Sequence, residues 1–261
     1  LMDRLHLDMW LQDKYLLNGV DIRLRLNRSS GTFHLINNVD DTNYKTVIQE
    51  ARLYVRRVEV LPKAGNDISH TLSRTTAKYP IRRVEVKTFT IAAGLRSKIE
   101  DHLFQGQLPK RLIVGIVKNS SFNGSNKENP FQFKHYNVSK IEVSRDGKTL
   151  CTRPFEPKFG NNEKNYLRSY LSLYEATGQL GTNTSHGISY DDYPGGYTLW
   201  AFDFTPDQGS DEGHFHPIKS GQLRVELQFA DALTETVNVI LYAEFDNTIE
   251  INSLREVILD Y

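Results

Sequence analysis

Two histidines separated by one residue, His214 and His216, form the pattern in this 261-residue sequence that most suggests chemistry. Side chains at positions i and i+2 of a β-strand point to the same face, so the two imidazoles could bind one metal ion. A metal-binding cupin would add a Glu a few residues later and a third His further on. Here the next Glu is Glu226, no His follows, and Pro217 indicates a loop. We therefore predict no metal, no cofactor and no catalytic residue.

The other candidates for chemistry lack the partners they would need. Cys151 is the single cysteine, and no recognisable spacing supplies a His base for it, so we interpret it as a half-buried strand residue. Acidic pairs begin at Asp40, Asp191 and Asp211, but none follows the EF-hand pattern for Ca²⁺. Gly-rich phosphate loops, Ser-centred elbows and zinc-type Cys/His spacings are also absent from the sequence. This favours a structural or binding protein over an enzyme.

The composition is that of a globular chain without net charge. The sequence is 39% hydrophobic and 25% charged, with 32 basic and 32 acidic residues. A nucleic-acid reader normally carries a basic surplus, and the Arg pairs at 56–57 and 82–83 have Glu59 and Glu85 beside them. The apolar runs all fall short of the ~20 residues of a transmembrane helix. We expect neither specific nucleic-acid contact nor a membrane-spanning segment.

Alternating apolar residues predict a chain built mostly of β-strands. Leu223, Val225 and Leu227 alternate with polar residues, which is typical of a strand with one buried face. Residues 237–245 are apolar at nearly every position, which suits a central strand covered on both faces. Further strands are predicted at residues 20–26, 32–36, 47–60, 81–91, 112–117, 138–143, 148–151 and 197–204.

Local signals add one hairpin and one main helix. Asp146-Gly147 between two strand-like runs predicts a type I′ turn, which needs positive φ at both positions. Residues 163–176 carry tyrosines at helical spacing and are followed by Gly178, a suitable cap. A second, short helix is predicted over residues 68–78. Because strands rarely alternate with helices, we predict an all-β jelly-roll β-sandwich with one main helix and long loops.

A series of short motifs in fixed order is more specific than any one of its members. The motifs are Gly106-Gln-Leu-Pro-Lys-Arg-Leu-Ile-Val-Gly-Ile-Val117, Phe122-Asn-Gly-Ser125, Asn129-Pro-Phe-Gln-Phe-Lys-His-Tyr-Asn-Val138, Arg145-Asp-Gly-Lys148, Pro154-x-x-Pro157-x-Phe159 and Gly196-Tyr-Thr-Leu-Trp-Ala-Phe-Asp-Phe204. The series resembles that of the Polinton/Maverick-type (adintovirus-like) double jelly-roll major capsid proteins of viruses and transposable elements. The chain resembles their C-terminal half, with an N-terminal jelly-roll missing.

The resemblance implies a structural protein of the virion capsid. It implies a homotrimeric capsomer of pseudo-hexagonal outline, in which each subunit supplies two jelly-rolls. The partners implied are further copies of the chain in the capsid lattice, together with minor capsid or penton proteins. The implied location is the virion, with the host cytoplasm or nucleus during assembly. The family has no catalytic residues to transfer to this sequence.

The predicted organisation is an N-terminal arm or inter-domain linker at residues 1–19, followed by a jelly-roll domain at residues 20–261. A loop and helix insertion is predicted at about residues 160–196. Because the chain begins at Leu1 and not at Met, we expect a fragment or a processed product.

The long loops at residues 120–130, 177–196 and 207–220 are expected to form an outer tower or to reach neighbouring subunits. Aromatic residues often dominate such contacts. The predicted interface residues are Phe122, Tyr190, Tyr193 and Phe215. Two other functions stay open, a carbohydrate-binding jelly-roll that uses Tyr190, Tyr193 and Tyr197, and a cupin that binds metal through His214 and His216.

Overall fold

The computed structural model describes residues 2–12, 14–37, 44–104, 106–149, 153–160 and 163–259. These residues form two units. The smaller unit comprises Leu1–Arg28, Tyr44–Arg83 and Asp246–Tyr261, and the larger comprises Ser29–Asn43 and Val84–Phe245. The predictions for Cys151 and for the acidic pair at Asp40 lie outside the described residues.

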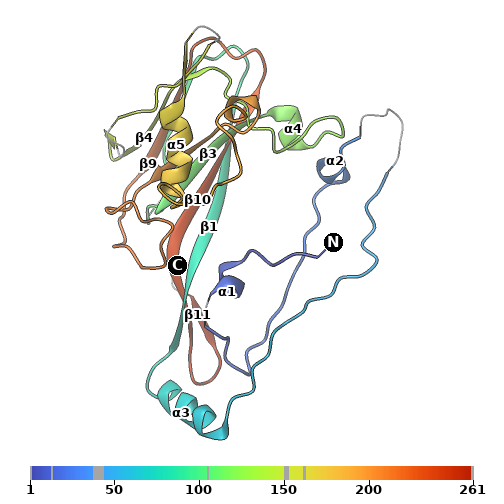
Figure 1. Ribbon diagram of the computed structural model, residues 1–261, viewed down its shortest axis with the longest axis vertical. Helices are drawn as coiled ribbons and strands as arrows, with labels where there is room; N and C mark the ends of the chain where they lie inside the picture. The colour runs from blue at the N-terminus through green and yellow to red at the C-terminus, as the bar shows by residue number, and fades with distance from the viewer. Residues whose placement is uncertain are drawn as a thin grey trace. The chain divides into compact units, whose positions relative to one another are not determined.

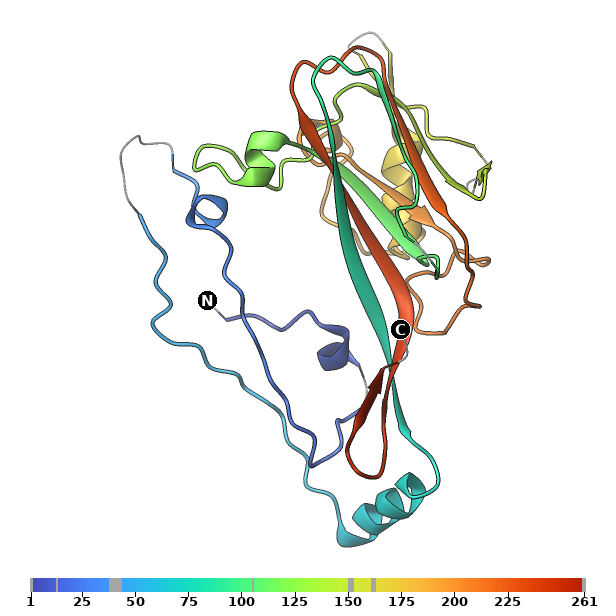
Figure 2. The same cartoon turned by 180° about the vertical axis from the view of Figure 1, so that it is seen from behind.

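Two antiparallel sheets form the sandwich of the larger unit (Figure 1). The first sheet has the strand order β1 (Ala77–Ile91), β10 (Val237–Ile251), β3 (Arg111–Lys118), β8 (Leu199–Asp203). The second has the order β2 (Ser97–Glu100), β9 (Leu223–Phe229), β4 (Val138–Arg145), β5 (Lys148–Thr149). β1 and β10, which run side by side in Figure 2, contribute residues to both units.

This strand order is that of a jelly-roll. The strands pair in a nested way, β1 with β10, β2 with β9, β3 with β8 and β4 with β5. The chain therefore folds as one long hairpin that wraps into two sheets, and the pairs β10–β3 and β9–β4 complete the sheets. Double-sheet jelly-rolls are built in this way. The predicted all-β jelly-roll β-sandwich is confirmed.

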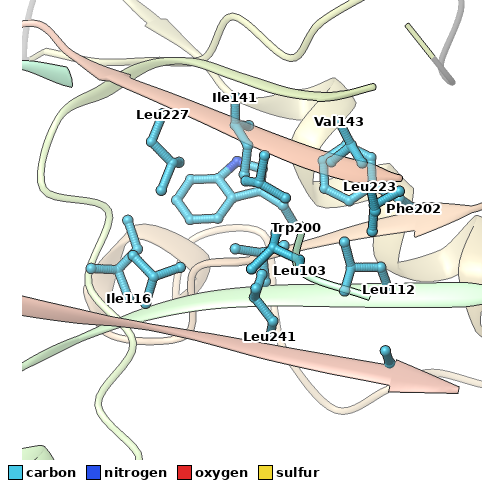
Figure 3. Close-up of a cluster of buried hydrophobic side chains, with 14 of the residues drawn as sticks. Leu103, Leu112, Ile116, Ile141, Val143, Trp200, Phe202, Leu223, Leu227 and Leu241 are labelled. Atoms are coloured by element: carbon cyan, nitrogen blue, oxygen red, sulfur yellow. The ribbon is translucent and has the colours of Figure 1, made fainter. Parts of the chain in front are cut away.

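The apolar faces of the two sheets form one core between them. β9 buries Leu223, Val225 and Leu227 and leaves the intervening side chains half-exposed, as the alternation predicts. Val239 and Leu241 of β10 are fully buried as well. Figure 3 shows side chains of both sheets, among them Ile141, Leu227 and Leu241, converging around Trp200.

The main helix, α5 (Leu167–Ala176), confirms the helix predicted at residues 163–176. It begins later than predicted because Lys164–Asn165 forms β7, which pairs with β6 (Lys158–Phe159). Gly178 follows it with φ of 63°, and an added Cβ there would collide with the Asp211 carboxylate. A side chain at this position would therefore strain the backbone and would require the Asp211 carboxylate to move.

Both central residues of the predicted hairpin turn have positive φ, 49° at Asp146 and 78° at Gly147. They connect β4 to β5, where Arg145 pairs with Lys148. These two positive φ values confirm the predicted type I′ turn. The backbone twist of such a turn matches that of the flanking strands. By contrast, β2 was missed by the sequence analysis, since its four residues are too few for a clear alternation.

Several strand predictions near the N-terminus are wrong. The structure assigns no strand to residues 20–26 or 47–60, which Figure 2 draws as a plain trace. Their apolar side chains are exposed, for example Leu26 at 67% and Val47 at 64%. Residues 32–36 were also predicted as a strand, but α2 (Gly31–His34) occupies most of this range.

The smaller unit also contains α1 (Asp8–Leu11), α3 (Pro62–Leu72) and β11 (Val257–Leu259), which pairs with the end of β10. The short helix predicted at residues 68–78 overlaps α3 only at residues 68–72. α3 begins six residues earlier, because Pro62 at its first turn favours a helix start, and it ends at Leu72. The described part of the chain offers no helix with the length and apolar character needed to cross a lipid bilayer.

Candidate functional site

The four predicted interface residues lie in different environments. Phe215 is 51% exposed on the loop between β8 and β9, and Tyr190 is 36% exposed. Phe122, on α4 (Asn119–Asn123), is half-buried. Tyr193 is fully buried. Phe122, Tyr190 and Phe215 therefore stay predictions for contacts with another subunit, whereas Tyr193 does not.

Tyr193 is buried because it belongs to the aromatic cluster around α5. Its ring stacks at 5.8 Å from that of Tyr166, and its hydroxyl donates a hydrogen bond to the Leu199 carbonyl at 2.6 Å. The Thr198 hydroxyl in turn donates to the Tyr193 carbonyl at 2.8 Å. Burial raises the pKa of the Tyr193 hydroxyl well above its ordinary value. The residue therefore anchors the loop internally and is unavailable to a subunit or a sugar.

Tyr190 exposes only part of its ring to solvent. One face stacks on Tyr166 with the ring centroids 4.6 Å apart, and the ring meets that of Tyr170 in a T-shaped contact with centroids 5.4 Å apart. Tyr197, the third aromatic residue of the carbohydrate hypothesis, is 53% exposed. The three tyrosines at 190, 193 and 197 therefore do not form a joint exposed platform, because the middle one is in the core.

Glu128 fastens the loop at residues 119–130. Its carboxylate accepts hydrogen bonds from Lys118 at 2.7 Å, from Ser121 at 3.1 Å and from Ser120. The hydrogen bond from Lys118 and then that from Ser120 lower the pKa of the Glu128 carboxyl from 4.5 to about 2. The ionised form of Glu128 therefore stabilises this loop.

A Glu128→Gln variant tests that role through its pH dependence. Because the pKa of Glu128 is lower in the folded chain, its ionisation stabilises the fold above pH 4.5, and this contribution is lost as the pH falls towards about 2. We expect the variant to be less stable than the parent at pH 7, and the difference to shrink between pH 4.5 and 2. Urea unfolding at several pH values measures it. Glu156→Gln, at an exposed position, is the matched control, and a pH-independent difference for Glu128→Gln would contradict the assignment.

His214 and His216 flank Phe215, and both face the carboxylate of Asp207. His214 Nε2 lies 3.0 Å from Oδ2 of Asp207, and His216 Nε2 lies 3.1 Å from Oδ1. Desolvation opposes the ionisation of Asp207, but the hydrogen bonds from His214 and from the Gly209 amide hold the pKa of this carboxyl well below its usual range. Asp207 was not predicted as a ligand, because the cupin pattern places further ligands after the His pair and Asp207 precedes it.

A buried ion pair lies beneath α5. Arg111 of β3 and Glu244 of β10 are cross-strand partners, and Nη2 of Arg111 lies 2.7 and 2.6 Å from the two carboxylate oxygens. The side chains are only 10% and 6% exposed. Nη1 of Arg111 donates to the Ala176 carbonyl at 2.5 Å. The pair therefore ties both strands to the end of the helix.

A surface hollow of about 450 Å³ is lined by residues 134–137, 194–195 and 231–234. Two of its ionisable side chains, those of His135 and Tyr136, have partners within the chain. The His135 ring stacks on Phe159 with centroids 4.2 Å apart, and burial lowers the pKa of His135. The Tyr136 hydroxyl donates to Glu235 at 3.0 Å. Among the residues that line this hollow, no nucleophile is paired with a base.

The described residues thus define a jelly-roll β-sandwich with long, internally anchored loops. No family model matches the sequence. A curated protein of Caenorhabditis elegans, uncharacterized protein F54H12.2, is 26% identical over 259 residues, which cover 97% of this chain and 61% of that protein. The chain therefore spans about three-fifths of the length of the curated relative that it matches.

Three solved structures are similar over part of the chain. PBCV-1 VP54 has a TM-score of 0.43 at 10% identity, covering 72% of this chain and 52% of that one. The mavirus major capsid protein has a TM-score of 0.37 at 11% identity, covering 71% and 41%. A chain of the Sputnik virophage structure has a TM-score of 0.38 at 13% identity, covering 71% and 39%. The strand order, and not these matches, defines the fold.

Proposed function

We propose that this chain is one jelly-roll of a double jelly-roll major capsid protein of the Polinton/Maverick type. Its role is structural and not enzymatic, its location is the virion capsid, and it assembles in the host cytoplasm or nucleus. The partners are further copies of the same protein, which form trimeric capsomers and a capsid lattice, and then minor capsid or penton proteins.

The observation that carries the proposal is that three of the family-like sequence motifs meet at Gly115. This glycine pairs with Leu199 across β3 and β8, and an added Cβ would lie only 2.6 Å from Phe133 Cδ1 and 2.8 Å from Leu199 Cδ2. Phe133 is hydrogen-bonded to residues of the third motif, through its amide to the Gly196 carbonyl at 2.7 Å and through its carbonyl to the Thr198 amide at 3.0 Å. The three motifs therefore pack together as one unit in this chain, which supports the proposal that they are a structural signature.

The exposed stretches at residues 20–26 and 47–60 support a second jelly-roll. Both alternate apolar and polar residues as half-buried strands do, yet their apolar side chains are exposed in the smaller unit, for example Ile22 at 46% and Val55 at 50%. A stretch with this pattern is stable when it joins a sheet and buries one face. We infer that an upstream jelly-roll of a double jelly-roll protein covers these exposed apolar side chains. Since this chain matches 61% of its relative, the longer relative has room for that domain.

Apolar residues on the long loops support self-association. Phe131, Leu180, Phe215 and Ile218 are 63%, 55%, 51% and 77% exposed. Exposed apolar side chains indicate an interaction surface when they form a contiguous patch, and aromatic residues often anchor such contacts. In a trimer of double jelly-rolls, these loops would contact neighbouring sandwiches.

Mass photometry of the longer protein, with its upstream segment included, tests the proposal. We expect the longer protein to be a trimer, whereas this chain alone should associate weakly because half of each interface is absent. The chain alone is the matched control at the same concentration. A longer protein that stays monomeric where interfaces above roughly 2,000 Å² should hold would rule out the capsid function.

A further inference from the structure

We propose that Asp207, His214 and His216 form a Zn²⁺ site that fastens the loop between β8 and β9. The three residues are brought together in space, with their ligand atoms all within 4.8 Å of one another. The proposal concerns the chemistry of this loop and does not depend on the capsid function. The spacing of His214 and His216 alone predicted no metal, because that pattern does not include Asp207.

The distances suit a tetrahedral metal ion. Zinc binds imidazole nitrogen and carboxylate oxygen at about 2.0–2.2 Å, so neighbouring ligands of a tetrahedral site lie about 3.3 Å apart. The separations here are 3.0 Å between His214 Nε2 and Asp207 Oδ2 and 3.1 Å between His216 Nε2 and Asp207 Oδ1. The two imidazole rings lie side by side with centroids 4.4 Å apart. Small side-chain movements would therefore place all three ligands around one ion.

A further carboxylate orients one of the ligands. Glu212 Oε2 lies 3.1 Å from Nδ1 of His214. Metal-binding histidines commonly donate the N–H of their other ring nitrogen to a carboxylate, which fixes the tautomer and directs the free nitrogen to the metal. Here this contact leaves Nε2 of His214 directed at Asp207. Glu212 therefore serves as a positioning residue.

Backbone hydrogen bonds order the turn after β8 that carries Asp207. Asp203, the last residue of that strand, accepts hydrogen bonds from the Thr205 amide at 2.8 Å and from the Ser210 amide at 3.1 Å. Within this turn, Oδ1 of Asp207 accepts from the Gly209 amide at 3.2 Å. The ligand is therefore presented by a structured turn that is attached directly to the sandwich.

The donor set selects zinc over calcium or magnesium, because two of its three ligands are imidazoles and the hard cations prefer oxygen. The site is also unlike a cupin centre. The side chains of Asp207 and His214 are 50% and 47% exposed on a loop, and Trp200 fills the interior of the sandwich. Zinc bound here would order the loop that carries Phe215.

Isothermal titration of the metal-free chain with zinc chloride tests the proposal. We expect saturable binding of one Zn²⁺ per chain, at least tenfold weaker binding in Asp207→Asn and in His214→Ala, and weaker binding in Glu212→Gln, since removal of such supporting partners typically costs 10–100-fold in affinity. His70→Ala, at an exposed histidine on α3, is the matched control and should bind like the parent. Calcium and magnesium chloride should give no saturable binding.

X-ray absorption at the zinc edge provides the second measurement. The zinc-loaded parent chain should show two imidazole ligands, and the His216→Ala variant fewer. The parent chain alone gives the stoichiometry and the ligand count, so the test does not depend on whether the variants fold. Absence of one-to-one binding in the parent, or unchanged affinity in both Asp207→Asn and His214→Ala, would overturn the proposal and leave a hydrogen-bonded His–Asp cluster without metal.

Discussion

Replacing Arg111 with Met is expected to lower the free energy of unfolding by about 3–5 kcal/mol. The Arg111 side chain is 10% exposed, and its guanidinium contacts both carboxylate oxygens of Glu244, whose side chain is 6% exposed. Removing the guanidinium leaves an ionised carboxylate in the interior without its charge partner, and the loss is large because desolvation is no longer offset. The variant also loses the hydrogen bond to the Ala176 carbonyl. Urea unfolding measures the difference.

The double variant Arg111→Met with Glu244→Met is the control for this interpretation. Replacing both charges with apolar side chains of similar volume removes the uncompensated charge, so much of the stability should return. Lys158→Met breaks an exposed ion pair with Glu163 and should change the unfolding midpoint little. If Arg111→Met unfolds like the parent, or if the double variant is no more stable than Arg111→Met, the pair is not buried as described.

The second large effect is expected for Leu227→Ala, which should cost about 2–5 kcal/mol of unfolding free energy. Leu227 is fully buried on β9 and pairs with Ile141 of β4 and Lys98 of β2. Shortening it leaves a cavity beside Trp200, where Figure 3 shows its side chain. Densely packed surroundings fill such a cavity only in part.

Val86→Ala is the matched control for Leu227→Ala, since Val86 is 57% exposed on β1. Its stability should change by less than about 0.5 kcal/mol, as is usual at the surface. Denaturant unfolding of both variants gives the comparison. Equal losses for the two variants, or a loss below about 0.5 kcal/mol for Leu227→Ala, would mean that the inward face of β9 is assigned wrongly.

The sequence predicts the sandwich best where a strand has one face in the core. Along β9 the period of two is visible because Arg224, Glu226 and Gln228 point away from the buried face. The same period at residues 20–26 and 47–60 predicts a half-buried strand but cannot say which sheet receives it. These strands are not formed, and their apolar side chains are exposed.

Elements that depend on local chemistry are also predictable. The turn at Asp146-Gly147 needs only two residues that tolerate positive φ, and α5 needs only an apolar stripe at helical spacing. The start of α3 at Pro62 was missed, although proline in a first helical turn is a local signal that could have indicated it.

The candidate sites depend on tertiary structure and were predicted less well. Tyr193 lies in a polar, Gly-containing loop, so nothing local reveals that the aromatic cluster of α5 buries it. Arg111 and Glu244 are 133 residues apart and meet only through the register of β3 with β10. Asp207 precedes the His pair by seven and nine residues, a spacing that only the turn after β8 brings together.

Electron microscopy of the longer protein, with the upstream segment present, tests the central claim most directly. The capsid function predicts class averages of a trimer with pseudo-hexagonal outline, in which six similar sandwiches surround one axis. In such a particle, the upstream jelly-roll should cover the exposed apolar side chains of residues 20–26 and 47–60. Single particles containing one sandwich, at concentrations where the expected interfaces should hold, would contradict the claim.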